Sequence, residues 1–327
     1  MTENHNEGLY KAASAAVDKW LELHAGETFD LDIICRQMEI HEASKRNLIS
    51  NKLNYEVKQG NLEKSNRIYT IVNKNIRIID WDKVDADNTL SIKWPCSHLD
   101  ASEFDFENHI VISQGDLIVF AGVSNMGKTA LAQNFLFENF DSHPCQYMVN
   151  EYNPGKFKRR ISKMDWANPF KEDNSPKFRL IERHTDWKYA LEPDWINIID
   201  WINLSDGDFW KIGSIMEGIQ DKLRKGIAVI CLQKNESKDL GTGGQYSEHL
   251  ASVYFNIDFQ RLTVRKVKEH DNTMQPNGKV YGFEIVDGVH FTSIRQLKPC
   301  PKCHSRCLVN KIECLDCHSS GYVDKES

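Results

Sequence analysis

The chain has 327 residues, 40% hydrophobic and 27% charged, which is the composition of a soluble globular protein of about two domains. Its net charge of −6 argues against a protein that coats nucleic acid along its whole surface. No run approaches the roughly 20 apolar residues that a membrane-spanning helix needs, and the polar amino terminus lacks the apolar segment of a signal peptide. We therefore expect a cytoplasmic protein.

The amino-terminal region has the pattern of three helices followed by a hairpin. Apolar residues at helical spacing and short alternating runs predict helices over 9–21, 31–38 and 43–57, and strands over 62–64 and 67–72. This order resembles a winged helix-turn-helix domain, which we place at residues 1–80. Residues 81–98, polar and acidic at first, are interpreted as a connector.

The third predicted helix carries side chains that contact phosphates and base edges, namely Ser44, Lys45, Arg46, Ser50, Asn51 and Lys52. Between His41 and Arg77 there are eight Lys or Arg residues against three Glu residues. We therefore expect this domain to contact duplex DNA, with docking to a protein as the alternative.

From residue 99 to 295, short buried strands alternate with helices. Apolar runs predict strands over 116–121, 146–149, 195–199 and 227–232, a helix over 129–139, and hairpins over 255–257, 262–267 and 279–291. Strands that alternate with helices indicate a parallel α/β sheet, whose ligands bind at the carboxyl ends of the strands.

A complete Walker A motif lies between the first of these strands and the helix: Gly122-Val123-Ser124-Asn125-Met126-Gly127-Lys128-Thr129. Its glycines let the backbone wrap around phosphates, and the helix presents its positive end to them. Lys128 is expected to reach the β and γ phosphates, and Thr129 to offer its hydroxyl to Mg2+. The motif predicts an ATP site that comprises Gly122, Ser124, Asn125, Met126, Gly127, Lys128, Thr129 and Ala130.

Two carboxylates complete the predicted site. Asp200 ends the strand at 195–199 and is expected to hold Mg2+ with Thr129. AAA-type ATPases place the water-activating carboxylate beside this Asp, but the next residue here is Trp201. RecA-type ATPases place it after the strand that follows the Walker helix, where this chain has Glu151. Glu151 is therefore the candidate catalytic base, and a solvated loop residue is the alternative.

The stretch from Gly115 to Gly122, continued by Ser124 to Ala132, resembles the core of RecA-like ATPases of the DnaB replicative-helicase type. It is especially similar to RecA-like ATPases of phages and prophages, and the similarity covers residues 94–292. The resemblance implies a homo-oligomer, a hexamer or filament, that hydrolyses ATP between subunits and acts on single-stranded DNA. The expected setting is a bacterial or phage-infected cell.

The resemblance also implies roles for residues after the Walker strands. Gln233 fits the position of a Gln that contacts the γ-phosphate and relays its presence to the DNA loops. Lys266 and Lys268 fit a strand that reaches the neighbouring subunit's nucleotide, and an exposed basic strand is the alternative. The glycine-rich segment 234–245, with Lys234 and Lys238, fits a flexible loop that grips single-stranded DNA, and an ordinary surface loop is the alternative. A further basic run, at 156–160, is interpreted as a solvated helix face, and contact with DNA or with a neighbouring subunit is the alternative.

Nine cysteines occur in the chain, five of them between residues 300 and 317. Cys300-Pro301-Lys302-Cys303 and Cys314-Leu315-Asp316-Cys317 each form a CxxC knuckle, and two knuckles close a tetrahedral zinc site. We therefore predict a structural zinc ribbon over residues 296–327, and redox-active or incidental cysteines are the alternative. Cys307, His304 and His318 are candidates to replace one of the four ligands.

Three functions remain open at this point. The first is a DNA-handling motor or strand-exchange ATPase, although a winged helix in place of the primase-binding domain of DnaB-type helicases argues against a replicative helicase. The second is an ATP-sensing regulator or loader that binds duplex DNA. The third is a phage-defence or signalling scaffold in which the zinc ribbon recruits a protein.

Overall fold

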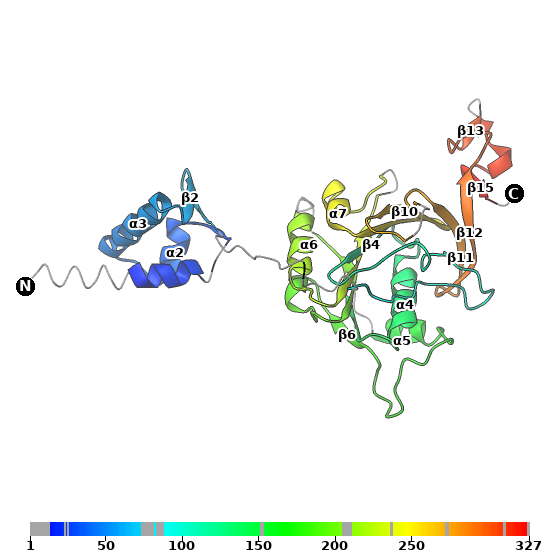
Figure 1. Ribbon diagram of the computed structural model, residues 1–327, viewed down its shortest axis with the longest axis horizontal. Coiled ribbons are helices and arrows are strands. Elements are labelled where there is room, and N and C mark those ends of the chain that lie inside the picture. The colour runs from blue at the N-terminus through cyan, green and yellow to red at the C-terminus, as the bar shows by residue number, and fades with distance from the viewer. Residues whose placement is uncertain are drawn as a thin grey trace, which may run out of the picture. The chain divides into compact units, whose positions relative to one another are not determined.

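The computed structural model describes residues 14–22, 24, 26–72, 82, 88–150, 154–204, 211–235, 238–271, 275–309 and 312–325. Contacts divide the chain into two units, Met1–Val84 and Asp85–Ser327 (Figure 1). Among the described residues, no helix is long and apolar enough to cross a membrane.

Unit 1 packs helices against a small antiparallel sheet. Residues 14–22 are helical, and they are followed by α2 (Leu31–Gln37) and α3 (Ala43–Lys58). The strands of the described sheet lie in the order β1 (Thr28–Asp30), β3 (Ile68–Ile71) and β2 (Leu62–Ser65). The hairpin of β2 and β3 lies where the sequence predicts two strands, whereas β1 was not predicted. Strand β1 leads into α2 because Asp30 accepts a hydrogen bond from the amide of Ile33, 2.7 Å away, and caps the helix.

The described strands of unit 2 form one ten-stranded sheet in the order β15-β12-β11-β10-β9-β4-β8-β7-β5-β6. The six strands from β9 to β6 are parallel, and β10, β11, β12 and β15 continue the sheet as antiparallel strands. The strand bounds are β4 Leu117–Gly122, β5 Cys145–Val149, β6 Arg179–Glu182, β7 Ile196–Ile202, β8 Ile227–Gln233, β9 Val253–Asp258, β10 Arg261–Val267, β11 Val280–Val286, β12 His290–Pro299 and β15 Tyr322–Asp324.

Helices cover both faces of this sheet (Figure 1). On one face, α4 (Lys128–Asn139) and α5 (Pro154–Ile161) enclose an aromatic-rich core. On the other face, α6 (Ile212–Gln220) encloses an aliphatic core. It lies beside α7 (Gln245–Leu250) and the 3-10 turn Trp187–Tyr189. Every residue of β4 is buried, because the strand lies at the centre of the sheet with a layer on each side. The unit is an α/β domain with a mostly parallel sheet and a Walker loop after its central strand β4.

The segment before β4 packs into the core. Trp94 is 5% exposed, and its ring contacts Phe106, Phe135 and Phe255 at centroid distances of 5.5 to 5.6 Å. The predicted connector, 81–98, therefore ends in residues that are part of the aromatic core. The burial of Trp94 could not be predicted from composition, because a single Trp-Pro pair in a polar segment is also typical of a linker.

The carboxyl-terminal segment continues the main sheet. Strand β12 runs through the predicted boundary at residue 295, and β15 returns to pair with it at Leu297, Lys298 and Pro299. Between them lie the short hairpin β13 (Leu308–Val309) and β14 (Ile312–Glu313) and the 3-10 turn Leu315–Cys317.

Candidate nucleotide site and cysteine cluster

The Walker loop turns sharply between β4 and α4. Both of its glycines are needed, because the neighbouring atoms leave no room for a side chain. A Cβ on Gly122 would lie 2.7 Å from the carbonyl oxygen of Ile257 on the adjacent strand. Gly127, which precedes α4, has φ +102°, and a Cβ there would lie 2.6 Å from a methyl group of Ile285. The absence of side chains at these two positions lets the loop backbone pack closely. A loop whose amides bind phosphate needs such an accessible backbone.

Lys128, the first residue of α4, is the main cation of the loop. Its Nζ donates to the carbonyl oxygens of Gly122 and Val123, each 2.8 Å away, and lies 3.5 Å from Oε1 of Gln233. Only 8% of the residue is exposed, and this burial lowers the pKa of Lys128, while Cys231 and Asp200 act in the opposite direction. The ammonium group is held at the positive end of the helix, where the β and γ phosphates of a nucleotide would lie.

Asp200 lies on β7 opposite the Walker helix. Its Oδ1 accepts a hydrogen bond from the Thr129 hydroxyl at 3.3 Å, and its Oδ2 accepts one from the Tyr147 hydroxyl at 2.7 Å. Burial raises the pKa of Asp200, and these hydroxyl donors oppose the rise. A threonine hydroxyl beside a buried carboxylate is the oxygen donor set that Mg2+ prefers, so Thr129 and Asp200 fit the ion.

Two cavities meet at the Walker loop. One, of about 430 Å3, lies between the loop and the ends of β9 and β11, and Phe259 and Gln260 line it. The other, of about 410 Å3, extends from Thr129 and Asp200 toward α5. Both cavities are lined by Asn125 of the loop and by Thr129.

Arg160 lines both cavities, so the prediction that 156–160 forms a solvated helix face is wrong for this residue. It is half-buried on α5 and donates from NH2 to the carbonyl oxygen of Gly288 at 2.8 Å. Its Nε is buried and has no hydrogen-bond partner among the described residues. The basic run at 156–160 gave no sign of which member would turn inward, because that depends on the register of α5 against the sheet.

Glu151, the predicted base, lies outside the described residues, which stop at Asn150 and resume at Pro154. The end of β5 that precedes it is placed next to Asp200, since Val149 pairs with Asp200 and the Asn150 amide donates to the Asp200 carbonyl oxygen at 3.2 Å. The chain therefore leaves β5 beside Asp200.

Gln233 ends β8, directly beside the end of β4, and pairs with Gly122. Its side chain faces Lys128, while its carbonyl oxygen accepts hydrogen bonds from the amide and the hydroxyl of Thr242, at 2.7 and 3.0 Å. One residue therefore contacts both the Walker lysine and the glycine-rich segment that follows.

The structure corrects the prediction for the glycine-rich segment. Lys234 is not available to DNA, because its side chain is 4% exposed and its Nζ lies 2.6 Å from Asp258. Gly241 packs between β4 and β8 and donates to the Tyr254 hydroxyl at 2.8 Å, so the segment is anchored and not freely flexible there. Lys238 is exposed, and a cavity of about 830 Å3 is lined by Lys238, Gln233, Arg265 and Trp201 among others.

Lys266, on β10, and Lys268, which follows the strand, point to the end of α7 in their own chain. The Nζ of Lys266 donates to the carbonyl oxygens of Glu248 and His249 at 2.6 and 2.9 Å, and that of Lys268 donates to Leu250 at 3.4 Å. Burial and the neighbouring Lys268 lower the pKa of Lys266. In this arrangement both lysines cap the last carbonyls of α7, a contact favoured by the negative end of a helix.

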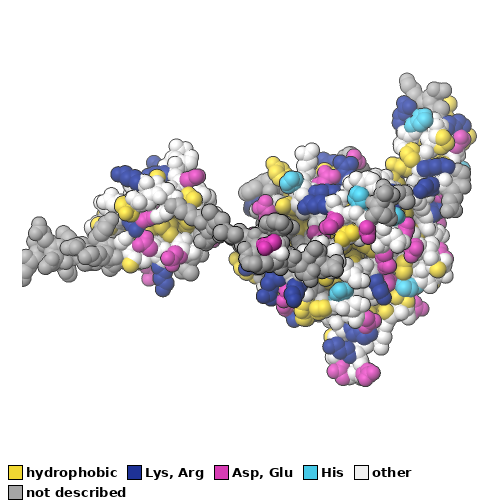
Figure 2. Space-filling model, viewed as in Figure 1, with side chains coloured by type: hydrophobic (Ala, Val, Ile, Leu, Met, Phe, Trp, Pro, Cys, Tyr) yellow, Lys and Arg dark blue, Asp and Glu magenta, His cyan; other side chains and the backbone are white. Residues whose placement is uncertain are grey.

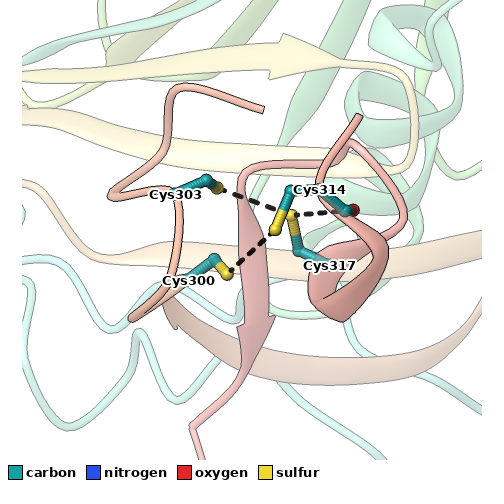
Figure 3. A group of neighbouring side chains, drawn as sticks. All are labelled: Cys300, Cys303, Cys314 and Cys317. Atoms are coloured by element: carbon teal, nitrogen blue, oxygen red, sulfur yellow. Dashed lines mark hydrogen bonds between the residues drawn. The ribbon is translucent and has the colours of Figure 1, made fainter. Parts of the chain in front are cut away.

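Four cysteines, Cys300, Cys303, Cys314 and Cys317, converge from the two knuckles (Figure 3). The Sγ atoms of Cys300 and Cys314 are 3.9 Å apart, and those of Cys303 and Cys317 are 3.6 Å apart. These distances are far too long for disulfides, which require about 2.05 Å. They match the edges of a sulfur tetrahedron around zinc, which are about 3.8 Å for Zn–S bonds of about 2.3 Å.

The spare ligands do not join this cluster. Cys307 is half-buried and lies 3.8 Å from the Ser305 carbonyl oxygen, and His304 and His318 are exposed. Both histidines follow the second cysteine of a knuckle with positive φ, 50° and 47°. The two knuckles share the sequence Cys-x-x-Cys-His-Ser, a short repeat that explains this common geometry.

Three basic side chains of α3 form ion pairs within unit 1. Lys52 is 8% exposed and lies 2.8 Å from Asp18 and 2.6 Å from Glu56, so it does not decorate the surface as predicted. Lys45 pairs with Glu42, and Arg46 pairs with Asp32. On the face drawn in Figure 2, Lys and Arg side chains are interspersed with Asp and Glu side chains.

No family model and no curated protein matches the chain. Among solved structures, the chain is similar to a KaiC-like protein of the hyperthermophilic archaeon Pyrococcus horikoshii, with 16% sequence identity and a TM-score of 0.47. The match covers 63% of this chain and 99% of that one.

Proposed function

We propose that the chain is an ATP-hydrolysing RecA-like protein that works as an oligomer on single-stranded DNA, as a helicase, translocase or recombination ATPase. The observation that carries the proposal is the double contact of Gln233. Its side chain lies 3.5 Å from the Walker lysine, and its carbonyl oxygen holds Thr242 of the glycine-rich segment. A nucleotide that moves this side chain would therefore act directly on the segment expected to meet DNA.

The proposed reaction is phosphoryl transfer from ATP to water. Lys128 and the amides of the Walker loop bind the β and γ phosphates, and Arg160 adds a positive charge from α5. Thr129 and Asp200 hold Mg2+, which neutralises phosphate charge when it is bound. Glu151 is the proposed base that orients and deprotonates the attacking water.

The proposed oligomer is a hexamer or filament in which Lys266 or Lys268 reaches the nucleotide of a neighbouring subunit. The helix-capping contacts of both lysines would be exchanged for phosphate contacts in the assembly. Lys238 is the exposed cation of the glycine-rich segment and the proposed contact to the DNA backbone. Unit 1 is proposed to bind duplex DNA, and the cysteine cluster to bind zinc for a structural purpose.

Hydrolysis with and without single-stranded DNA tests this proposal. We expect DNA to stimulate turnover of the wild-type chain, and Glu151→Gln to bind ATP without hydrolysing it, since the amide cannot accept the proton of the water. Glu182→Gln is the matched control, because Glu182 lies at the end of the neighbouring strand β6, and it should retain turnover. If Glu151→Gln hydrolyses ATP as fast as the wild type, the base lies elsewhere.

An ATP-sensing regulator or loader that binds duplex DNA is the second candidate. The anchored glycine-rich segment favours it, because the buried Lys234–Asp258 pair leaves the segment with fewer accessible cations than a DNA-gripping loop usually offers. This candidate predicts slow hydrolysis that single-stranded DNA does not stimulate, together with tight binding of duplex DNA by unit 1.

A further inference from the structure

A second group of metal-ligand side chains lies on the aromatic-rich face of unit 2, away from the four-cysteine cluster. Cys96 and His98 belong to the segment before β4, and Glu138 lies in the last turn of α4. The Sγ of Cys96 is 3.7 Å from Nε2 of His98, and that nitrogen is 2.7 Å from Oε1 of Glu138. One ligand atom from each residue lies within 4.8 Å of the other two.

The turn that carries Cys96 and His98 is held in place by hydrogen bonds. The Ser97 amide donates to the Ser102 carbonyl oxygen at 2.8 Å, and the Ser97 hydroxyl oxygen accepts from the amides of Leu99 and Asp100. Asp100 in turn accepts from the hydroxyl of Thr292 and the amide of Ser293 on β12, each at 2.7 Å. The ligands are therefore positioned before any ion binds.

The ring of His98 is also fixed by an aromatic neighbour. It stacks on Trp166 with the ring centroids 4.7 Å apart and an angle of 14° between the ring planes. Glu138 is confined in the same way by burial, since its side chain is only 10% exposed. A ligand set with restricted rotamers loses little side-chain entropy when it binds an ion.

The electrostatic field around these residues is negative. Burial, together with the carboxylates of Glu138, Glu103 and Glu107, raises the pKa of the Cys96 thiol to about 11, and Lys93 opposes this rise. The same field that disfavours a bare thiolate attracts a divalent cation, which neutralises it.

We propose that Cys96, His98 and Glu138 bind a zinc ion, with water as the fourth ligand. Sulfur, imidazole nitrogen and carboxylate oxygen together favour zinc over Mg2+ or Ca2+. For a tetrahedral ion the sulfur and nitrogen ligands lie about 3.6 Å apart, as Cys96 and His98 do, and nitrogen and oxygen about 3.3 Å apart. His98 and Glu138 separate by roughly half an ångström when the ion takes the place of the proton between them.

Binding at this site releases a proton. The ion displaces the thiol proton of Cys96, which passes to water, and Nε2 of His98 binds the ion as a neutral imidazole that carries its proton on Nδ1. The bound ion joins the segment before β4 to the far end of the Walker helix α4. Its role is therefore structural: it fixes the carboxyl-terminal end of the helix whose first residue is Lys128.

Zinc content of purified full-length protein, measured by mass spectrometry of the metal, tests the proposal. We expect Cys96→Ser, His98→Ala and Glu138→Gln each to lose about one zinc per chain relative to the wild type. Glu103→Gln is the matched control, because Glu103 contributes charge but no ligand atom, and it should keep the wild-type content. The comparison is independent of the four-cysteine cluster, which is intact in every variant.

The same zinc content in the wild type, Cys96→Ser and His98→Ala would overturn the proposal. Because Cys96 is half-buried, Cys96→Ser could lose zinc by misfolding, so its circular dichroism is compared with that of the wild type. His98 is exposed, so we expect His98→Ala to fold, and the same spectrum checks this. If Cys96→Ser is unfolded, the zinc content of His98→Ala alone decides the outcome.

Discussion

At the scale of single residues, the nucleotide site depends on charges that are held away from water. Lys128 is buried against backbone carbonyls, Asp200 is buried between two hydroxyl donors, and Arg160 has a buried Nε. Charges in such a place act strongly on a phosphate because the surroundings screen them little.

Arg160 gives the sharpest test at this scale. We expect Arg160→Ala to lower kcat for ATP hydrolysis by about 100-fold, because a positive charge that faces the phosphates is removed. Arg160→Lys should recover part of the rate, since it keeps the charge without the planar fork. Arg159→Ala, an exposed neighbour on α5, should leave the rate unchanged. Steady-state kinetics check all three, and equal rates for Arg160→Ala and Arg159→Ala would place Arg160 outside the reaction.

The sequence predicts the residues of the phosphate cradle better than it predicts their neighbours. The Walker motif is local, so Gly122, Gly127 and Lys128 are recognisable without any tertiary contact. Arg160 and the burial of Lys234 depend on how α5 and β9 pack, and no local pattern records that packing. Lys52 was misjudged for the same reason, because its partner Asp18 lies on another helix.

At the scale of elements, β8 connects the nucleotide site to the glycine-rich segment. The strand places Gln233 beside Gly122, and Thr242 binds back to Gln233 through both its amide and its hydroxyl. The glycine-rich segment therefore starts directly after Gln233 and is hydrogen-bonded back to Gln233 through Thr242. A shift of Gln233 would move both ends of the segment.

Thr242→Val tests this connection, because it removes the hydroxyl bond to Gln233 and preserves the branched shape. We expect the stimulation of hydrolysis by single-stranded DNA to be about tenfold smaller in Thr242→Val than in the wild type. The loss of a hydrogen bond that contributes roughly 1.4 kcal/mol corresponds to this factor. Thr242→Ser keeps the hydroxyl and should behave as the wild type. Full stimulation of Thr242→Val would mean that the hydroxyl plays no part in the coupling.

The predictability of elements follows from their length and burial. Strands β4, β5, β7 and β8 are buried apolar runs, and each was predicted within a few residues. Strand β6 (Arg179–Glu182) and strand β1 (Thr28–Asp30) were missed, because both are short and partly polar at the edge of a sheet. The pairing of β15 with β12 was also missed, since it joins residues separated by the whole cysteine cluster.

At the scale of the whole molecule, the cysteine cluster is a separate source of stability within unit 2. Among the described residues, Val323 is the one partly buried apolar residue that packs against the four buried cysteines. A segment with so small a core needs a metal ion to fold.

Removal of zinc should therefore unfold this segment while the main sheet remains. We expect a strong chelator to abolish protection from hydrogen exchange over residues 300–321, while the amides of β4 and β8 stay protected. Cys314→Ser should show the same local loss without chelator, whereas Cys307→Ser should not. Protection that survives chelation in the wild type would show that the segment folds without metal.

ATP turnover by the purified chain, measured beside Lys128→Ala, tests the central claim most directly. We expect the wild type to hydrolyse ATP in the presence of Mg2+, and Lys128→Ala to lose at least about 100-fold of the rate, because the buried ammonium group stabilises charge on the phosphates. Lys188→Ala, which changes a lysine beside α6, serves as the control and should match the wild type. Equal turnover by Lys128→Ala and the wild type would contradict the assignment of the Walker loop as the catalytic nucleotide site.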